Sequence, residues 1–129
     1  MRRAACSVAG LVAGAAAVWC ARELLERVRI SGASMEPALR DGDRVLVSRL
    51  VYWLRPPRPG DVGLARVAAV PGGLTVKRVV ALCDDGRLVL QGDNLAFSTD
   101  SRHFGPVPRH AVLGRVWFRY WPPDRRGRL

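Results

Sequence analysis

The fold class is decided by residues 74–92, LTVKRVVALCDDGRLVLQG. Short apolar alternations run along 74–82 and again along 87–92, and Asp84, Asp85 and Gly86 between them form a turn signal. A period of two is typical of strands, whereas the apolar residues of a helix recur every three to four positions. This stretch therefore predicts two strands joined by a turn.

The same pattern continues on both sides of this stretch, as short apolar alternations broken by Gly, Pro and Asp. Turn-like breaks occur at 40–42, 55–60 and 71–73. Further strands are predicted at 27–32, 43–50, 61–67 and 113–121. We therefore predict an all-β domain, a compact barrel or sandwich of short antiparallel strands.

The N-terminus differs from the rest of the chain, because residues 4–21 carry no charge. As a helix this segment would nearly span a hydrocarbon core of ~30 Å, so we expect one transmembrane anchor helix. A cleaved signal peptide beginning at Arg2 and Arg3 is the alternative. The anchor is favoured because ARELLERVR, residues 21–29, continues the helical pattern directly into the domain.

The predicted organisation has three parts. Residues 1–26 form the anchor helix with its flanks, residues 27–123 form the β domain, and residues 124–129 form a basic tail. A chain of 129 residues has no room for a second core.

The charge balance is strongly basic, with 21 Lys and Arg against 11 Asp and Glu. Such a surface attracts anions, whether nucleic acid, acidic proteins or anionic lipid. Cys6, Cys20 and Cys83 form no disulfide or zinc pattern, and His103 and His110 lack partners at ligand spacing. We therefore expect neither a metal nor a cofactor.

Lys77 is the only lysine in a chain with twenty arginines. Arginine stays protonated under ordinary conditions, whereas a buried lysine can lose its proton and act as a base. In the predicted strand Lys77 shares a face with Thr75, Val79 and Ala81, so desolvation is expected to lower its pKa. Lys77 is therefore a candidate general base.

Ser34 is the candidate nucleophile, set between Gly32 and Pro37 directly after a predicted strand. A strand that leaves into a Gly-containing turn exposes a hydroxyl and frees backbone N–H groups for an oxyanion.

A polar loop at residues 92–108, GDNLAFSTDSRHFGPVP, is the third candidate element. Asp100 and Arg102 are two positions apart and could pair, while Ser98 and Ser101 offer hydroxyls that could orient an amine.

Taken together, these segments resemble the type I signal peptidases, a family of serine peptidases with a Ser/Lys dyad. The resemblance covers most of the chain from Ile30 to Trp121 and rests on five motifs in order. These are Gly32-Ala33-Ser34-Met35-x-Pro37, Gly42-Asp43, Gly60-Asp61, Lys77-Arg78, and Gly92-Asp93-Asn94 followed by Ser98-Thr99-Asp100-Ser101-Arg102.

The resemblance implies a role for each matched residue. Ser34 would attack the scissile carbonyl, Lys77 would act as base and then as acid, and the Ser34 N–H would help to hold the oxyanion. Ser98 would hydrogen-bond the Lys77 amine, and Asp100 and Arg102 would brace the site. The further supporting residues would be Gly32, Met35, Asp93 and Asn94.

Two departures from the family pattern point to a compact form. Gly32 stands where some members have a serine that assists the oxyanion, and Cys83-Asp84-Asp85 replaces the usual Pro-Gly-Asp. The short connection between Ala81 and Gly92 leaves no room for the accessory β domain of larger members. With its closing stretch GRVWFRYWPP, residues 114–123, the chain is similar to the mitochondrial inner-membrane peptidase subunits and small bacterial relatives.

The resemblance also implies partners and a location. Family members with an N-terminal anchor hold the catalytic domain outside the cytoplasm, and they cut translocated precursors after small residues, commonly Ala-x-Ala. We therefore expect a single-pass protein of the plasma membrane with an extracytoplasmic catalytic domain, precursor proteins and membrane lipid as partners, and no nucleic acid. A partner subunit stays open, and so does the orientation from charge alone, because arginines flank residues 4–21 on both sides.

Two other functions are compatible with parts of the sequence. A self-cleaving Ser/Lys peptidase of the phage-repressor type would carry a DNA-binding domain or arm, whereas this N-terminus is uncharged and apolar. A non-catalytic basic β-barrel that binds nucleic acid is suggested by the aromatic cluster at 117–121 beside Arg115 and Arg119. Strand alternation also explains these aromatic residues, as partly core and partly membrane surface.

Overall fold

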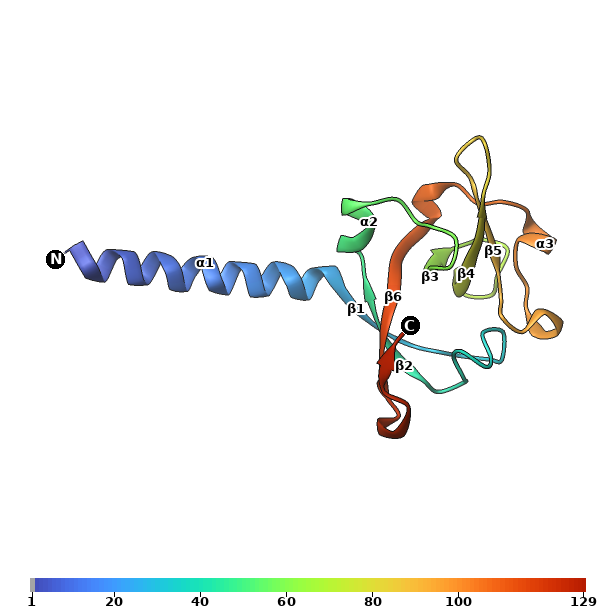
Figure 1. Ribbon diagram of the computed structural model, residues 1–129, viewed down its shortest axis with the longest axis horizontal. Coiled ribbons are helices and arrows are strands. Elements are labelled where there is room, and N and C mark those ends of the chain that lie inside the picture. The colour runs from blue at the N-terminus through green and yellow to red at the C-terminus, as the bar shows by residue number, and fades with distance from the viewer. Residues whose placement is uncertain (1) are drawn as a thin grey trace.

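One antiparallel sheet organises the protein in the computed structural model, which describes residues 2–129 except the side chains of residues 2–7 and Glu23. The sheet has the strand order β1-β2-β6-β3-β4-β5, and β7 pairs with β6 (Figure 1). The all-β prediction for the domain is confirmed. The strands are β1 (Leu25–Arg29), β2 (Arg44–Ser48), β3 (Val62–Arg66), β4 (Leu74–Leu82), β5 (Leu88–Gln91), β6 (Val112–Trp121) and β7 (Gly127–Arg128).

All six predicted strands have counterparts, and β4 covers the predicted residues 74–82. Three short elements were not predicted, because each is too brief to show a period: helix α2 (Leu50–Leu54), helix α3 (Ser101–Phe104) and strand β7. The remaining short elements are 3-10 turns, η1 (Leu95–Phe97), η2 (Arg109–Ala111) and η3 (Pro123–Arg125).

The predicted barrel is not closed, which corrects the expectation from the sequence. Strand β6 pairs through its first half with β3 and through its second half with β2, so it joins the two halves of the sheet. The end strands β1 and β5 are not paired with each other in the described part of the chain. At the crossover point, a Cβ on Gly114 would lie 3.0 Å from the Ser48 carbonyl oxygen, so the close approach of β2 requires glycine there.

Two clusters of buried apolar side chains fill the two halves of the sheet. One lies around β4, β5 and the start of β6 and includes Tyr52, Val79 and Leu90. The other lies around β2 and the end of β6 and includes Met35 and Leu39, which anchor the segment between β1 and β2. That segment carries Ser34, so the second core holds the candidate nucleophile in place.

Helix α1 (Arg2–Leu24) projects away from the sheet, with its described side chains from Val8 to Arg22 exposed (Figure 1). Among the residues that the structure describes, no helix is long and apolar enough to cross a membrane, so the expected transmembrane helix is not shown there. The helix also ends at Leu24 and β1 begins at Leu25, so the helical pattern expected for 21–29 does not continue.

Two buried aspartates brace the domain away from Ser34. Asp43 accepts hydrogen bonds from Arg125 Nη1 at 2.7 and 2.9 Å, and Arg119 lies 3.4 Å away, which ties η3 to the start of β2. Asp61 accepts from Arg55 at 2.9 Å and from the Tyr52 hydroxyl at 3.1 Å. The two Gly-Asp motifs of the sequence therefore stabilise the scaffold that presents the site.

Candidate active site

Ser34 lies in a tight turn that follows β1. The turn is closed by hydrogen bonds from Glu36 N to the Ala33 carbonyl (3.2 Å) and from Leu39 N to the Met35 carbonyl (2.9 Å). Met35, only 1% exposed, pins the turn to the core directly after the half-buried Ser34. Since the next side chain is fixed, the Ser34 hydroxyl has a defined direction.

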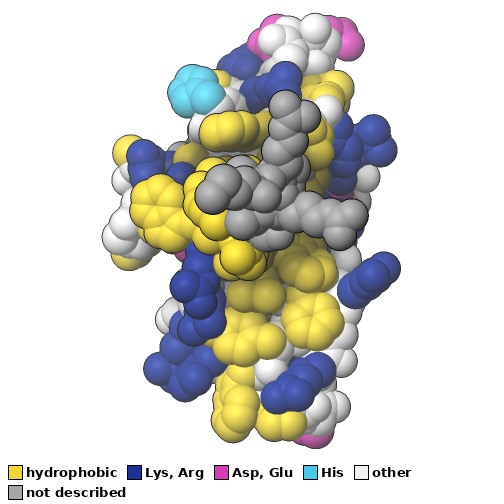
Figure 2. Space-filling view, turned by 90° about the vertical axis from the view of Figure 1, so that its left-hand side faces the viewer, with side chains coloured by type: hydrophobic (Ala, Val, Ile, Leu, Met, Phe, Trp, Pro, Cys, Tyr) yellow, Lys and Arg dark blue, Asp and Glu magenta, His cyan; other side chains and the backbone are white. Residues whose placement is uncertain are grey.

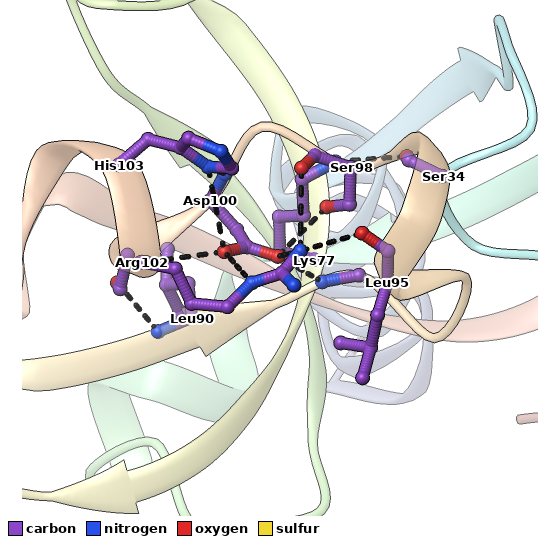
Figure 3. Close-up of polar contacts among 10 residues, drawn as sticks. Ser34, Lys77, Leu90, Leu95, Ser98, Asp100, Arg102 and His103 are labelled. Atoms are coloured by element: carbon purple, nitrogen blue, oxygen red, sulfur yellow. Dashed lines mark hydrogen bonds and ion pairs between the residues drawn. The ribbon is translucent and has the colours of Figure 1, made fainter.

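Lys77 lies on β4 and its amine meets this hydroxyl (Figure 3). The distance from Lys77 Nζ to Ser34 Oγ is 2.8 Å, although 43 positions separate the two residues. Lys77 is 4% exposed, and this burial lowers its pKa below the usual 10.5, while the charge of Asp100 opposes the change. The structure thus brings a buried amine against the candidate nucleophile.

Asp100 is the centre of a hydrogen-bond network behind Lys77. Its fully buried carboxylate accepts from Arg102 Nε (2.9 Å), the Gly92 N–H (3.1 Å) and the Ser98 hydroxyl (2.9 Å). Burial alone would raise the pKa of Asp100, but these donors outweigh it and lower the pKa to about 2. The pair between Asp100 and Arg102 therefore forms, with an ionised carboxylate near the Lys77 amine.

Ser98 contacts Asp100, and no hydrogen bond between Ser98 and Lys77 is found among the described residues. The Ser98 hydroxyl is buried and donates to Asp100 Oδ2, an ionised acceptor. Ser98 is therefore linked to Lys77 through Asp100. Ser101 is used elsewhere as well, since its hydroxyl accepts from the Leu90 N–H at 2.8 Å.

The segment from Gly92 to Asn94 contacts the back of the Ser34 turn. The Asn94 N–H donates to the Ser34 carbonyl at 2.9 Å, and a Cβ on Gly92 would overlap both that carbonyl oxygen and Ser98 Oγ. Asp93 points away and forms two hydrogen bonds with Arg78, at 2.8 and 2.9 Å. Asn94 thus supports Ser34 through its backbone, and Asp93 holds the segment against β4.

The backbone of the Ser34 turn offers a candidate for the oxyanion contact. Gly32, at φ +84°, has no side chain to offer and donates its N–H to Asp41 Oδ1 at 2.9 Å. The Ser34 N–H has no acceptor among the described residues, which leaves it available for a ligand. A backbone donor at the nucleophile itself is a common oxyanion arrangement.

A groove of about 300 Å³ opens beside Ser34. One wall is β1, whose outer edge has no strand partner in the described chain, and the other is the start of β4, which pairs with β5 only from Arg78 onward. An extended peptide could therefore hydrogen-bond to either wall. The lining residues are Glu26, Val28, Arg29, Ile30, Ser31, Ser34, Met35, Leu64, Leu74, Thr75 and Val76.

Sequence reasoning missed the groove and the Tyr52–Arg55–Asp61 brace. The unpaired start of β4 gives no sequence signal, whereas the Gly60-Asp61 motif could have pointed to the brace. No group of three or more His, Cys, Asp or Glu side chains among the described residues is placed to hold a metal ion.

Comparison with known proteins agrees with this geometry. The family model described as signal peptidase, peptidase S26, matches residues 3–86 and 83–121. The chain is 34% identical over 130 residues to mitochondrial ATP-independent inner membrane protease subunit 1a of Arabidopsis thaliana, covering 84% of this chain and 77% of the relative. It is 33% identical to mitochondrial inner membrane protease subunit 1 of Homo sapiens, covering 74% of this chain and 69% of the relative.

A bacterial relative is also similar. Probable signal peptidase I-2 of Synechocystis sp. is 30% identical over 142 residues, which covers 78% of this chain and 65% of the relative. Because the family match extends over most of the chain, the protein belongs to the S26 family of signal peptidases and is a serine endopeptidase.

Proposed function

We propose that this protein removes signal or leader peptides from precursor proteins, with Ser34 as nucleophile and Lys77 as general base. The observation that carries the proposal is the 2.8 Å contact between a buried lysine amine and a serine hydroxyl at the end of a groove. The names of the relatives, which are processing and signal peptidases of mitochondria, chloroplasts and bacteria, support the same activity.

Acylation begins with the neutral Lys77 amine. Lys77 Nζ takes the Ser34 hydroxyl proton as Ser34 Oγ bonds to the scissile carbonyl carbon, and the carbonyl electron pair moves to oxygen. The Ser34 N–H is placed to donate to this oxyanion. The intermediate collapses, the C–N bond breaks, and the Lys77 ammonium gives its proton to the leaving amine.

Deacylation repeats these steps with water. Lys77 takes a proton from the water as its oxygen attacks the ester carbon, and the proton returns to Ser34 Oγ as the C–O bond breaks. The ionised Asp100 stabilises the ammonium that forms in each half-reaction, because its charge raises the Lys77 pKa. The network behind Lys77 thus keeps the amine basic enough to accept a proton despite its burial.

The groove favours an extended substrate with small side chains. Its two strand edges can pair with a peptide, and a volume of about 300 Å³ leaves little space beyond a backbone and small residues. We therefore propose cleavage after small residues such as those of an Ala-x-Ala junction. From Glu26 to Ile30 the groove follows β1, so the peptide would extend roughly 15 Å between the end of α1 and Ser34.

We also propose that the enzyme acts at the plasma membrane, with its catalytic domain on the extracytoplasmic side and lipid as a partner. Membrane-associated relatives support this location, since those of Arabidopsis and mammals are named for the mitochondrial inner membrane. The groove starts beside α1, which fits a substrate whose apolar segment lies in the bilayer while the segment before its cleavage site leaves it.

The test is Lys77→Arg, assayed by cleavage of a precursor with an Ala-x-Ala junction. The guanidinium keeps the positive charge but cannot surrender a proton near neutral pH, so kcat/KM should fall by at least about 10³-fold. The matched control is Arg66→Lys, the opposite exchange at an exposed position of β3, which should change little. Circular dichroism checks that both variants are folded, and more than a tenth of wild-type activity in Lys77→Arg would refute the dyad.

A further inference from the structure

Exposed apolar side chains gather on two sides of the domain. Figure 2 shows one group on the side from which α1 projects. The other group is in η1, where Leu95 is 52% and Phe97 is 72% exposed and Ala96 between them is exposed as well. In Figure 1, η1 is part of the orange loop between β5 and α3, at the end of the domain opposite α1. The η1 face, formed by Leu95, Ala96 and Phe97, is therefore separate from the apolar surface around α1.

The η1 face is fixed against the turn that carries the nucleophile. The Asn94 N–H donates to the Ser34 carbonyl at 2.9 Å, and the Phe97 N–H donates to the Asn94 carbonyl at 3.0 Å. The Arg102 guanidinium donates to the Leu95 carbonyl at 2.7 Å. These contacts hold the backbone, while the side chains of Leu95 and Phe97 stay in contact with water. A ligand that binds the η1 face therefore meets a surface that is already ordered.

The η1 face continues the line of the groove beyond Ser34. The groove follows β1 from Glu26 to Ile30 and reaches Ser34, and Figure 1 shows this path running from the α1 side toward the orange loop. An extended peptide that fills the groove up to Ser34 therefore leaves the site toward the loop that carries η1. The first three residues after the cleaved bond span roughly 10 Å, which brings them beside the η1 face.

The chemistry of the dyad places the leaving segment on the same side. Lys77 gives its proton to the leaving amine, so the first residue after the cleaved bond starts within hydrogen-bond reach of Lys77 Nζ. Asp100 lies close enough to this amine for its charge to act on it, and Asp100 accepts from the Ser98 hydroxyl at 2.9 Å. Ser98 directly follows Phe97 in the chain. The leaving segment thus begins next to the residues that carry the η1 face.

We propose that the η1 face binds the first residues of the mature chain and selects precursors with an apolar side chain at one of the three positions after the cleaved bond, +1 to +3. This inference rests on the proposed function, because it concerns the substrate of the same site. An apolar side chain that covers Leu95 and Phe97 removes apolar surface from water, and this gain raises kcat/KM for the matching precursor. Peptides with only polar residues after the bond are held by the groove alone.

The first measurement compares substrates of the full-length enzyme. A host peptide with an Ala-x-Ala junction carries Ser at positions +1 to +3, and three test peptides carry Leu at one of these positions. For the wild type, the ratio of kcat/KM between the best Leu peptide and the host should be about ten, because one large apolar side chain leaves water. In the variant with Leu95→Ser and Phe97→Ser this ratio should fall to about one. The matched control with Trp53→Ser and Leu54→Ser, equally exposed residues of α2, should keep the wild-type ratio.

Each ratio is measured within one protein, so a partial loss of folded enzyme does not change it. A wild type that cuts the host and all three Leu peptides at equal rates overturns this inference and leaves the proposed function in place. An unchanged ratio in the Leu95 and Phe97 variant also overturns it. A wild type that cuts none of the four peptides contradicts both the proposed function and this inference.

The second measurement maps the contact directly. The Ser34→Ala variant, which lacks the nucleophile, is mixed with a peptide that carries a photoreactive benzophenone side chain at position +2. Mass spectrometry of the digested protein should find the label on residues 94–99. A control peptide with the benzophenone five residues before the cleaved bond should label β1 instead. If lipid or another protein covers the η1 face in place of substrate, residues 94–99 stay unlabelled by the +2 probe, and this result overturns the inference.

Discussion

Replacing Asp100 with Asn removes one charge behind Lys77 and leaves a side chain of the same size. The pKa of Asp100 is about 2 in the folded protein against 3.8 for a free carboxyl. This difference corresponds to about 2.5 kcal/mol of folding free energy at 1.36 kcal/mol per tenfold change. Because the folded pKa is the lower one, this stabilisation is complete above about pH 4 and is lost as the pH falls through 2. Asp100→Asn should therefore lower the free energy of unfolding at pH 7 by about 2 kcal/mol.

The same substitution should move the pH profile of catalysis. Burial lowers the Lys77 pKa, and the Asp100 charge raises it. Without that charge the Lys77 pKa falls further, so the rise of kcat/KM with pH should have its midpoint at lower pH than in the wild type. The plateau rate should fall as well, since the developing ammonium loses its stabilising neighbour.

Two assays check these expectations. Urea denaturation of wild type and Asp100→Asn between pH 2 and pH 7 measures the first, and the gap between the two proteins should narrow as the pH approaches 2. Peptide cleavage across the alkaline range measures the second. A constant stability gap down to pH 2, or a midpoint that stays in place or moves to higher pH, would refute this account of Asp100.

Two further predictions concern Ser98 and the orientation in the membrane. Ser98→Ala should lower the free energy of unfolding by about 1 to 2 kcal/mol, because Asp100 loses one donor in a buried site, and it should reduce kcat/KM by less than about tenfold. A loss above a hundredfold with unchanged stability in urea would instead mean that Ser98 acts on Lys77 directly. For orientation, a protease added to intact spheroplasts should digest the catalytic domain; protection until the cells are lysed would place the domain on the cytoplasmic side.

Much of the domain could be predicted from local patterns. The strand predicted at residues 74–82 matches β4 from end to end, and the Asp84-Asp85-Gly86 turn signal lies between β4 and β5. At the N-terminus, the transmembrane helix predicted from the uncharged residues 4–21 is not shown among the described residues. The prediction that the helical pattern continues over residues 21–29 is wrong, because Glu26 and Val28 lie in β1 and pair with β2.

The sequence by itself determined the strand positions, the singular status of Lys77 and the order of the family motifs, because alternation, turn residues and residue type act over a few positions of the chain. Only the tertiary structure decided that the sheet stays open, that Lys77 Nζ reaches Ser34 Oγ at 2.8 Å, and that Ser98 bonds to Asp100. The contact between Lys77 and Ser34 joins residues 43 positions apart. The partner of the Ser98 hydroxyl depends on which of several acceptors is strongest once water is excluded. The groove depends in the same way on packing, since an unpaired strand edge exists only after every other surface has found its partner.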